Sequence, residues 1–307
     1  MIIRFIFSDI FLEIMSYCSI DKQYNHYNKF KSCFDIETLK RIADNWNRFN
    51  KNNQIVYRSN VSHKKLWNSI NDKLKDFCSD EVCWIEKLHM NNNENIKSSL
   101  LPKTPQEWNN NPHTWLSNFN IEDVMFQYEK AFSDFKFLGV YPVDFRSTAY
   151  TGKCLYEETC SINMKKLLNN NIKHIGMIIN LDKHNQSGSH WVALFICIDP
   201  SSECFGAYYY DSNANLPHEL VSLFMQDLNS QAKTIQKDIP FKLQYNSNRH
   251  QYENSECGMF SMVFLIRWLN YLKRRDDVSM SDIVGLDIRD KDVFELRTEL
   301  FRPNTIA

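Results

Sequence analysis

The sequence predicts an α+β protein with a mainly helical N-terminal arm, and three observations support this class. Residues 1–100 are polar, with apolar side chains spaced three and four residues apart, as in amphipathic helices. From about residue 136, short apolar or β-branched runs of strand length replace that pattern. A nearly unbroken apolar segment follows Cys257 and requires a helix buried on all sides. Strands with helices before and after them are typical of the α+β class.

The arm contains two clear amphipathic patterns, at 35–49 and 62–77, with Leu, Ile, Trp and Phe on one face. The segment 1–18 is apolar but interrupted by charged residues. It therefore predicts an amphipathic helix rather than a signal peptide, and no uninterrupted stretch is long enough to span a bilayer.

A polar loop at 91–103 marks the predicted domain boundary. It divides the chain into a helical N-terminal arm domain, 1–103, and a second domain, 104–307. Thr104 is the expected N-cap of the element that follows, with Pro105 at its first helical position.

The second domain begins with a predicted helix at 118–135, capped by Asn120 with Asp123 three residues later. Two further helices are expected, at 216–238 and 287–301. The runs with strand length and composition are 135–145, 174–181, 190–198, 204–211 and 241–246.

Composition limits the function. The chain has 307 residues, a net charge of −1 and a pI near 6.7, and these charge values argue against a protein that binds nucleic acid through bulk electrostatics. Its nine cysteines are odd in number and irregularly spaced, so no complete disulfide framework is expected and a reducing compartment is favoured. Cys78 and Cys83 lack a second pair at zinc-ribbon spacing, so they are interpreted as structural or incidental. No metal site or cofactor is predicted.

Cys257 is the candidate nucleophile. It begins the apolar helix directly after the polar run "ENSE", where free backbone N–H groups and their partial positive charge stabilise a thiolate. Gly258 allows a tight turn and leaves room for a substrate beside the sulfur. A cysteine at the start of a helix is more often a small buried residue, so the assignment depends on its partners.

The partners are predicted from strand ends. His190 begins one predicted strand and Asp211 ends the next, so an antiparallel hairpin would place the carboxylate beside the imidazole. Gln251 precedes Cys257 by six positions (257 − 251), and its amide could reach an oxyanion. Each residue has an ordinary structural explanation when taken alone. Their order His–Asp–Gln–Cys, each at the end of an element, favours catalysis.

Three segments carry a family resemblance: "SHWVALFI", "YYYDSNAN" and "RHQYENSECGMFS". They resemble the His-Trp, Asp-Ser and Gln-x5-Cys-Gly blocks of the SUMO-protease superfamily, which includes adenovirus-type and poxvirus-type processing proteases. The segments "TWLSNFNIEDVMF" and "IRDKDVFELRTELFR" extend the likeness to roughly 110–303. The resemblance implies a cysteine protease fold with a mixed central sheet flanked by helices.

The resemblance also implies roles. His190 would be the general base, Asp211 would orient it, Cys257 would attack, and Gln251 would line the oxyanion hole. A similar viral member of the superfamily has Asn where this chain has Asp211. Trp191 is expected to pack beneath the site rather than to act chemically, and both Trp191 and Gly258 are expected to contact substrate.

Two further residues are expected to contact substrate. Trp115 would line a narrow channel for small residues, although a core role is equally open. Asn118 stands where members of the family often use Asp to contact ubiquitin-like partners, which weakens any expectation that this protein binds SUMO.

The leading hypothesis is a viral cysteine endopeptidase that processes structural polyproteins or core proteins after small residues of the Gly-Gly-Xaa type. The alternatives are a protease that removes SUMO or a related modifier, and an inactive or acetyl-transferring relative that acts as an interaction module. The expected partners are protein substrates, with no membrane and nucleic acid at most as an accessory. The expected locations are the virus factory in the host cytoplasm and the virion.

Overall fold

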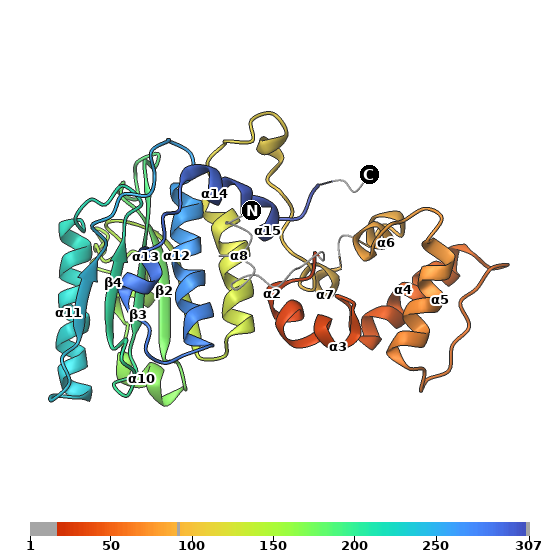
Figure 1. Cartoon of the computed structure of the whole chain (residues 1–307), viewed down its shortest axis with the longest axis horizontal. Coiled ribbons are helices and arrows are strands. Elements are labelled where there is room, and N and C mark those ends of the chain that lie inside the picture. The colour runs from red at the N-terminus through yellow and green to blue at the C-terminus, as the bar shows by residue number, and fades with distance from the viewer. Residues whose placement is uncertain (1–16, 91–92, 305–307) are drawn as a thin grey trace. The chain divides into compact units, whose positions relative to one another are not determined.

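The structure is a computed structural model and describes residues 17–90 and 93–304 (Figure 1). The helix predicted at 1–18 therefore lies almost wholly outside the described residues. The described chain forms two compact units, one at 107–299 and one that combines 17–106 with 300–304. Within these described ranges, no helix is both long and apolar enough to cross a membrane.

The N-terminal unit is helical, and both amphipathic patterns predicted there form helices. Asp35 caps α4, where its side chain accepts a hydrogen bond from the Thr38 backbone, and α4 packs against α5 around buried residues such as Leu39 and Leu66. The elements are α2 (Ile20–Lys22), η1 (Gln23–Tyr27), α3 (Asn28–Phe30), α4 (Ile36–Phe49), α5 (His63–Leu74), α6 (Glu81–Lys87) and α7 (Glu94–Lys97).

Residues 300–304 belong to this unit, so the prediction that everything after residue 103 forms one domain was wrong. The backbone N–H of Arg302 donates to the Pro102 carbonyl at 2.8 Å, and the Thr104 N–H donates to the Arg302 carbonyl at 2.8 Å. These bonds tie 300–304 to the segment before the boundary. They also correct the predicted cap, because the Thr104 hydroxyl donates to the Arg302 carbonyl at 2.7 Å and does not cap a helix.

The other unit is built on a five-stranded sheet in the order β1-β2-β3-β4-β5. The outer pairs β1/β2 and β4/β5 are parallel, and the inner pairs β2/β3 and β3/β4 are antiparallel, so the sheet is mixed as predicted. Every predicted strand is present, with slightly shorter bounds. The strands are β1 (Phe135–Pro142), β2 (His174–Asn180), β3 (Trp191–Cys197), β4 (Gly206–Tyr210) and β5 (Lys242–Tyr245).

Helices cover both faces of the sheet (Figure 1). Alternate residues of β3 explain this, because Leu194 packs in the core beside α11, whereas the ring of Phe195 stacks on Trp268 of α12 at 4.7 Å. The helices of this unit are η2 (Gln106–Asn109), α8 (Asn118–Ala131), α9 (Glu157–Cys160), α10 (Met164–Asn169), α11 (Glu219–Ile235), α12 (Cys257–Leu272), α13 (Met280–Val284), α14 (Asp290–Glu295) and α15 (Arg297–Leu300).

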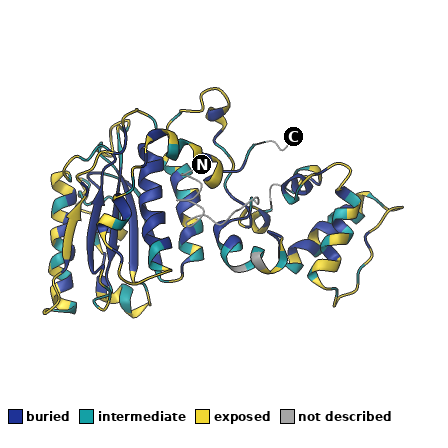
Figure 2. Ribbon diagram, viewed as in Figure 1, coloured by how far each residue is buried: buried dark blue, intermediate teal, exposed yellow. Residues whose placement is uncertain are grey.

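The apolar segment after Cys257 forms α12, and residues 257–270 are all buried (Figure 2). Helix α12 packs against β3 on one side and against α8 on the other, which explains why no polar face interrupts its sequence. The sheet and α8 together hold this helix, and with it Cys257, in a fixed position.

Two helix predictions require correction. Helix α8 is capped by Ser117, whose hydroxyl accepts from the Asn120 N–H at 3.3 Å. In return, the side-chain oxygen of Asn120 accepts from the Ser117 N–H at 2.9 Å. Asn120 is therefore the third helical residue, so the helix begins at 118 as predicted but its cap lies three residues before the predicted one. The helix predicted at 287–301 is divided into α14 and α15 at Leu296, next to the inward-pointing Arg297.

The cysteines also differ from expectation, because six of the nine form disulfides. The bonds are Cys18–Cys33, Cys78–Cys83 and Cys154–Cys160. The separations of 15, 5 and 6 residues close short local loops, which irregular spacing along the sequence did not reveal. The free cysteines are Cys197, Cys204 and Cys257.

Candidate active site

Cys257 is the first residue of α12, as predicted, and only 2% of it is exposed. Gly258 follows it where space is tight. A Cβ at Gly258 would lie 3.2 Å from the Trp191 ring and 3.3 Å from the Leu116 side chain. Glycine therefore lets the first turn of the helix pack directly against Trp191, and the thiol stays at the helix N-terminus where backbone N–H groups are unpaired.

A buried ion pair fixes the residue before the thiol. Arg297 donates from Nε and Nη2 to the two carboxylate oxygens of Glu256 at 2.9 and 2.8 Å. Its Nη1 also donates to the carbonyls of Pro112 and Thr114, and its guanidinium stacks on Trp108 at 4.1 Å. One side chain thus joins the start of α12 to the segment that leads to Trp115.

Breaking this pair should lower stability. We expect Arg297→Ala to reduce the free energy of unfolding by about 3–5 kcal/mol, because it leaves the Glu256 carboxylate buried without its cation. Lys136→Ala is the matched control, since it removes a more exposed ion pair with Glu129 and should cost about 0.2–1 kcal/mol. Urea unfolding of both variants measures the difference, and equal losses would contradict the role given to Arg297.

His190 and Asp211 lie next to each other, as expected from the predicted antiparallel hairpin. The antiparallel register pairs Ala193 with Tyr210, which brings the residue before β3 beside the residue after β4. His190 Nε2 lies 2.7 Å from Asp211 Oδ1. The carboxylate is fully buried, so its position is fixed by the protein and not by solvent.

Polar neighbours hold Asp211 in place. Its carboxylate accepts from the Asn213 backbone N–H at 2.8 Å and from the Asn215 amide at 3.0 Å. The side chain of Asn246 accepts from the Asp211 backbone N–H and donates to the Asp211 carbonyl. Sequence reasoning missed Asn246, because it lies 35 residues away and no spacing rule links the two positions.

The ring of His190 connects the acid to the thiol. Burial lowers the pKa of His190, but hydrogen bonds to Asp211 and Cys257 and the negative charge of both partners outweigh it, raising the pKa to about 9. For Asp211, burial raises the pKa and the bond and charge of His190 lower it, with a net lowering. An imidazolium stabilised between carboxylate and thiol can form an ion pair with a thiolate, which is the reactive form of cysteine.

Gln251 lies near the site but is engaged elsewhere in the loop. Its side-chain oxygen accepts from the Ser212 hydroxyl at 2.6 Å, and its Nε2 donates to the Glu253 carbonyl at 2.7 Å. None of the hydrogen bonds among the described residues joins Gln251 to Cys257. Because an amide nitrogen carries two protons, one N–H of Gln251 can still be offered to an oxyanion.

A groove of about 520 Å³ adjoins Trp191. Trp115, Asn118 and Trp191 all line it, so these three predicted substrate residues face one surface. Trp191 also donates from Nε1 to the Leu116 carbonyl at 3.2 Å and would touch a Cβ at Gly258, so it lies both beneath the thiol and in the groove wall. Trp115 is 44% exposed, which fits the groove rather than the core.

The sequence matches the Ulp1 protease family, C-terminal catalytic domain, over residues 123–306. A protein of Acanthamoeba polyphaga mimivirus described as a thiol protease is 30% identical over 258 residues, which cover 78% of this chain and 80% of that protein. A protein of African swine fever virus described as a SUMO-1 cysteine protease is 28% identical over 193 residues, covering 61% of this chain and 67% of that one.

A solved structure shows the same fold. The crystal structure of the African swine fever virus protease superposes with a TM-score of 0.65 and 20% identity, over 96% of this chain and 99% of that chain. The prediction of a cysteine protease fold of this type, with a mixed sheet flanked by helices, is confirmed.

Proposed function

The chain belongs to the Ulp1 family of cysteine proteases, and from that premise we propose that it is a viral endopeptidase that cleaves structural polyproteins or core proteins during virion maturation. The proposed cleavage sites are of the Gly-Gly-Xaa type. The observation that carries the proposal is the Asp211–His190–Cys257 chain of contacts at the end of the sheet.

In the proposed mechanism, Cys257 transfers its proton to His190, and the thiolate attacks the carbonyl carbon of the scissile bond. The backbone N–H of Cys257 and the Gln251 amide stabilise the oxyanion. His190 then donates its proton to the leaving amine, which leaves an acyl-thioester on Cys257. Water, deprotonated by His190, hydrolyses the thioester and restores the thiol, while Asp211 holds the ring throughout.

The position of Trp191 supports the proposed preference for small residues. Its ring would lie 3.2 Å from a Cβ at Gly258, the residue after the nucleophile, and together with Trp115 it lines the adjoining groove. Residues without a side chain can bring the scissile carbonyl to the thiolate without displacing Trp191.

Removal of SUMO or a related modifier is the second candidate. The description of the African swine fever virus relative as a SUMO-1 cysteine protease favours it, and the chemistry is the same. Asn118 counts against it, because the position that often carries a partner-binding Asp in the family carries an uncharged amide here. The intact contact between His190 and Asp211 disfavours an inactive relative. An acetyl-transferring relative would use the same groups, so this contact does not separate it from a protease.

A cleavage assay separates these candidates. Peptides with Gly-Gly-Xaa sites and SUMO fusions are incubated with the full chain, and kcat/KM is compared with that of peptides carrying Leu-Leu-Xaa. Preference for the free Gly-Gly-Xaa peptide supports the processing protease. Preference for folded SUMO fusions supports deconjugation, and cleavage of neither substrate would contradict both candidates. Localisation in virus factories and virions is proposed with the first candidate, and imaging of infected cells tests it.

Gln251→Ala tests the oxyanion hole. We expect kcat to fall by about 10²- to 10³-fold with little change in substrate affinity, because the amide acts on charge that develops only in the transition state. Gln251→Glu should be at least as harmful, since it places negative charge beside the oxyanion.

The contacts of Gln251 with Ser212 and Glu253 supply the competing explanation, a loop brace. A brace predicts a lower melting temperature with normal activity per folded molecule. Both quantities are measured on one preparation, with Ser212→Ala as the matched control that removes one bracing bond and leaves the amide. Loss of stability without loss of kcat would rule out the oxyanion role.

A further inference from the structure

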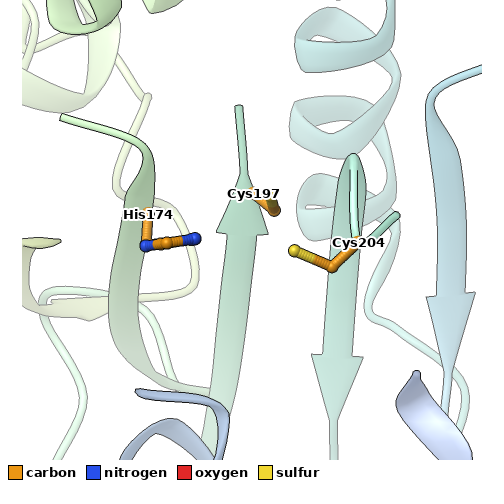
Figure 3. Close-up of side chains that lie close together, drawn as sticks. All are labelled: His174, Cys197 and Cys204. Carbon is orange, nitrogen blue, oxygen red and sulfur yellow. The ribbon is translucent and has the colours of Figure 1, made fainter. Parts of the chain in front are cut away.

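Three side chains with metal-binding donors meet at one end of the sheet. His174 begins β2, Cys197 ends β3, and Cys204 lies two residues before β4. The register pairs His174 with Cys197 and Cys197 with Gly206, so adjacent strands bring the three together. Figure 3 shows the imidazole and the two thiols directed toward one another, and their donor atoms all lie within 4.8 Å of each other.

The cluster is separate from the active site. His190 precedes the first residue of β3 and Cys197 is the last, so seven residues of extended chain, about 23 Å, separate them. The two thiols are fully buried and His174 is 8% exposed. Neither thiol is in a disulfide, and the proposed protease mechanism uses none of the three residues.

His174 is oriented as a ligand would be. Its Nδ1 lies 3.5 Å from the carboxylate of Asp134, and the ring also hydrogen-bonds to Cys204. The Asp134 contact uses one ring nitrogen and leaves Nε2 to face the thiols (Figure 3). A histidine that binds metal through one nitrogen usually gives the N–H of the other to a carboxylate or carbonyl, which fixes its tautomer.

Charge identifies the class of cation. Two aromatic rings flank the cluster, since Phe195 stacks on His174 at 5.8 Å and the buried Tyr208 lies close by. Asp134 and Ser202 are polar neighbours of the cluster. A buried site is least costly when it is neutral, and two thiolates balance a divalent cation. Thiolate and imidazole ligands favour zinc over magnesium or calcium, and a monovalent copper ion would leave a net negative charge.

The geometry points to a structural zinc site formed by His174, Cys197 and Cys204, with water or the Ser202 hydroxyl as the fourth ligand. Ser202 Oγ lies 3.1 Å from Cys204 Sγ and is partly exposed, so it stands on the solvent side of the cluster. Tetrahedral zinc holds thiolates about 3.8 Å apart, which requires only a small inward movement of the side chains. Binding would release the thiol protons and join the ends of β2 and β3 to the segment before β4.

The test uses the full chain in a Cys257→Ala background, because the catalytic thiol and His190 could themselves bind metal. Protein is purified without reductant, so that the three disulfides persist, and is titrated with Zn²⁺ against a chromophoric chelator. We expect one equivalent to bind and the melting temperature to rise. Co²⁺ should give thiolate-to-cobalt charge-transfer absorption and the strong visible bands of a tetrahedral site.

Variants assign the site. Cys204→Ser and Cys197→Ser should each abolish the charge-transfer band or weaken it, and lower the affinity by about 100-fold or more. Asp134→Asn retains all three ligands and should lower the affinity by about 10- to 100-fold. Circular dichroism of the metal-free variants establishes that each one folds. The wild-type chain is the parallel sample that shows whether Cys257 adds a second site.

Several outcomes would overturn the proposal. One is a binding stoichiometry below one in the Cys257→Ala protein, and another is affinity unchanged by Cys204→Ser. A cobalt spectrum without charge transfer would exclude thiolate ligands. A Cys197–Cys204 disulfide, detected by mass spectrometry in protein unfolded under alkylating conditions, would assign the pair to redox chemistry instead.

Discussion

Cys257→Ser is expected to abolish peptide hydrolysis while the protein remains folded. Sulfur and oxygen are similar in size, but a serine hydroxyl is far harder to deprotonate than a thiol and is therefore a far poorer nucleophile at the N-terminus of α12. The rate constant should fall by about 10⁴- to 10⁶-fold, the range seen when a nucleophile is removed from a comparable triad. The measurement is hydrolysis of a Gly-Gly-Xaa peptide alongside a thermal melt.

The matched control is Ser261→Ala. Ser261 lies one turn further along α12, is 1% exposed and has no hydrogen-bond partner for its hydroxyl among the described residues. Its substitution should leave turnover close to wild type. Normal turnover by Cys257→Ser, or equal losses in both variants, would contradict the nucleophile assignment.

Alkylation offers an independent test of the same thiol. Six cysteines are in disulfides, and Cys197 and Cys204 are 0% exposed, so Cys257 is the free thiol nearest to solvent. Brief treatment with iodoacetamide followed by peptide mapping should label Cys257 first. First labelling at either of the other two free thiols would count against its activation.

His190→Ala should be as damaging as loss of the nucleophile, with turnover reduced by about 10⁴-fold or more. Without the imidazole, no group in the described contacts of Cys257 can take its proton or return one to the leaving amine. Asp211→Asn should be milder, about 10²-fold, because the amide oxygen can still accept the N–H of the ring.

The pH profile separates the two roles. Asp211 helps to raise the pKa of His190 to about 9, so the imidazolium and its contribution to stability are fully present below about pH 6.5 and are lost as the pH rises through about 9. Removing the negative charge in Asp211→Asn should therefore move the alkaline limb of kcat/KM to lower pH. An unshifted limb, or activity as low as that of His190→Ala, would show that the orienting role is wrong.

Asp211→Asn also tests the packing around the acid. Its second carboxylate oxygen accepts from the amide of Asn215, and an amide nitrogen placed there would oppose another donor. A modest loss of stability is therefore expected beside the kinetic effect, so rates are compared per folded molecule.

Local sequence patterns predicted the strands, the buried helix α12 and the candidate catalytic residues. Strands were predictable because each apolar run has the length and composition of a buried strand, and α12 because a long apolar segment must be helical and enclosed. The pairing of His190 with Asp211 was also predictable, since antiparallel neighbours joined by a short connection have little freedom in register. The Cys-Gly start of α12 completed the candidate triad.

Contacts between distant segments were decided only by the tertiary structure. Arg297 and Glu256 are 41 residues apart, and Asn246 and Asp211 are 35 apart, so neither pair follows any periodicity. Residues 300–304 join the N-terminal unit through backbone hydrogen bonds of Arg302, which side-chain patterns do not encode.

The arrangement of the cysteines also could not be predicted from the sequence. Their spacing in the sequence predicted neither the three disulfides nor the group formed by Cys197, Cys204 and His174. A disulfide or a metal site depends on distances of a few ångströms between side chains, and the alignment of neighbouring strands sets those distances. His174 and Cys197 become neighbours only because β2 and β3 are antiparallel in that register. The sequence alone determined which residues could do chemistry at the N-terminus of α12. The register of the sheet decided that His174, Cys197 and Cys204 meet at the end of the sheet opposite the candidate active site.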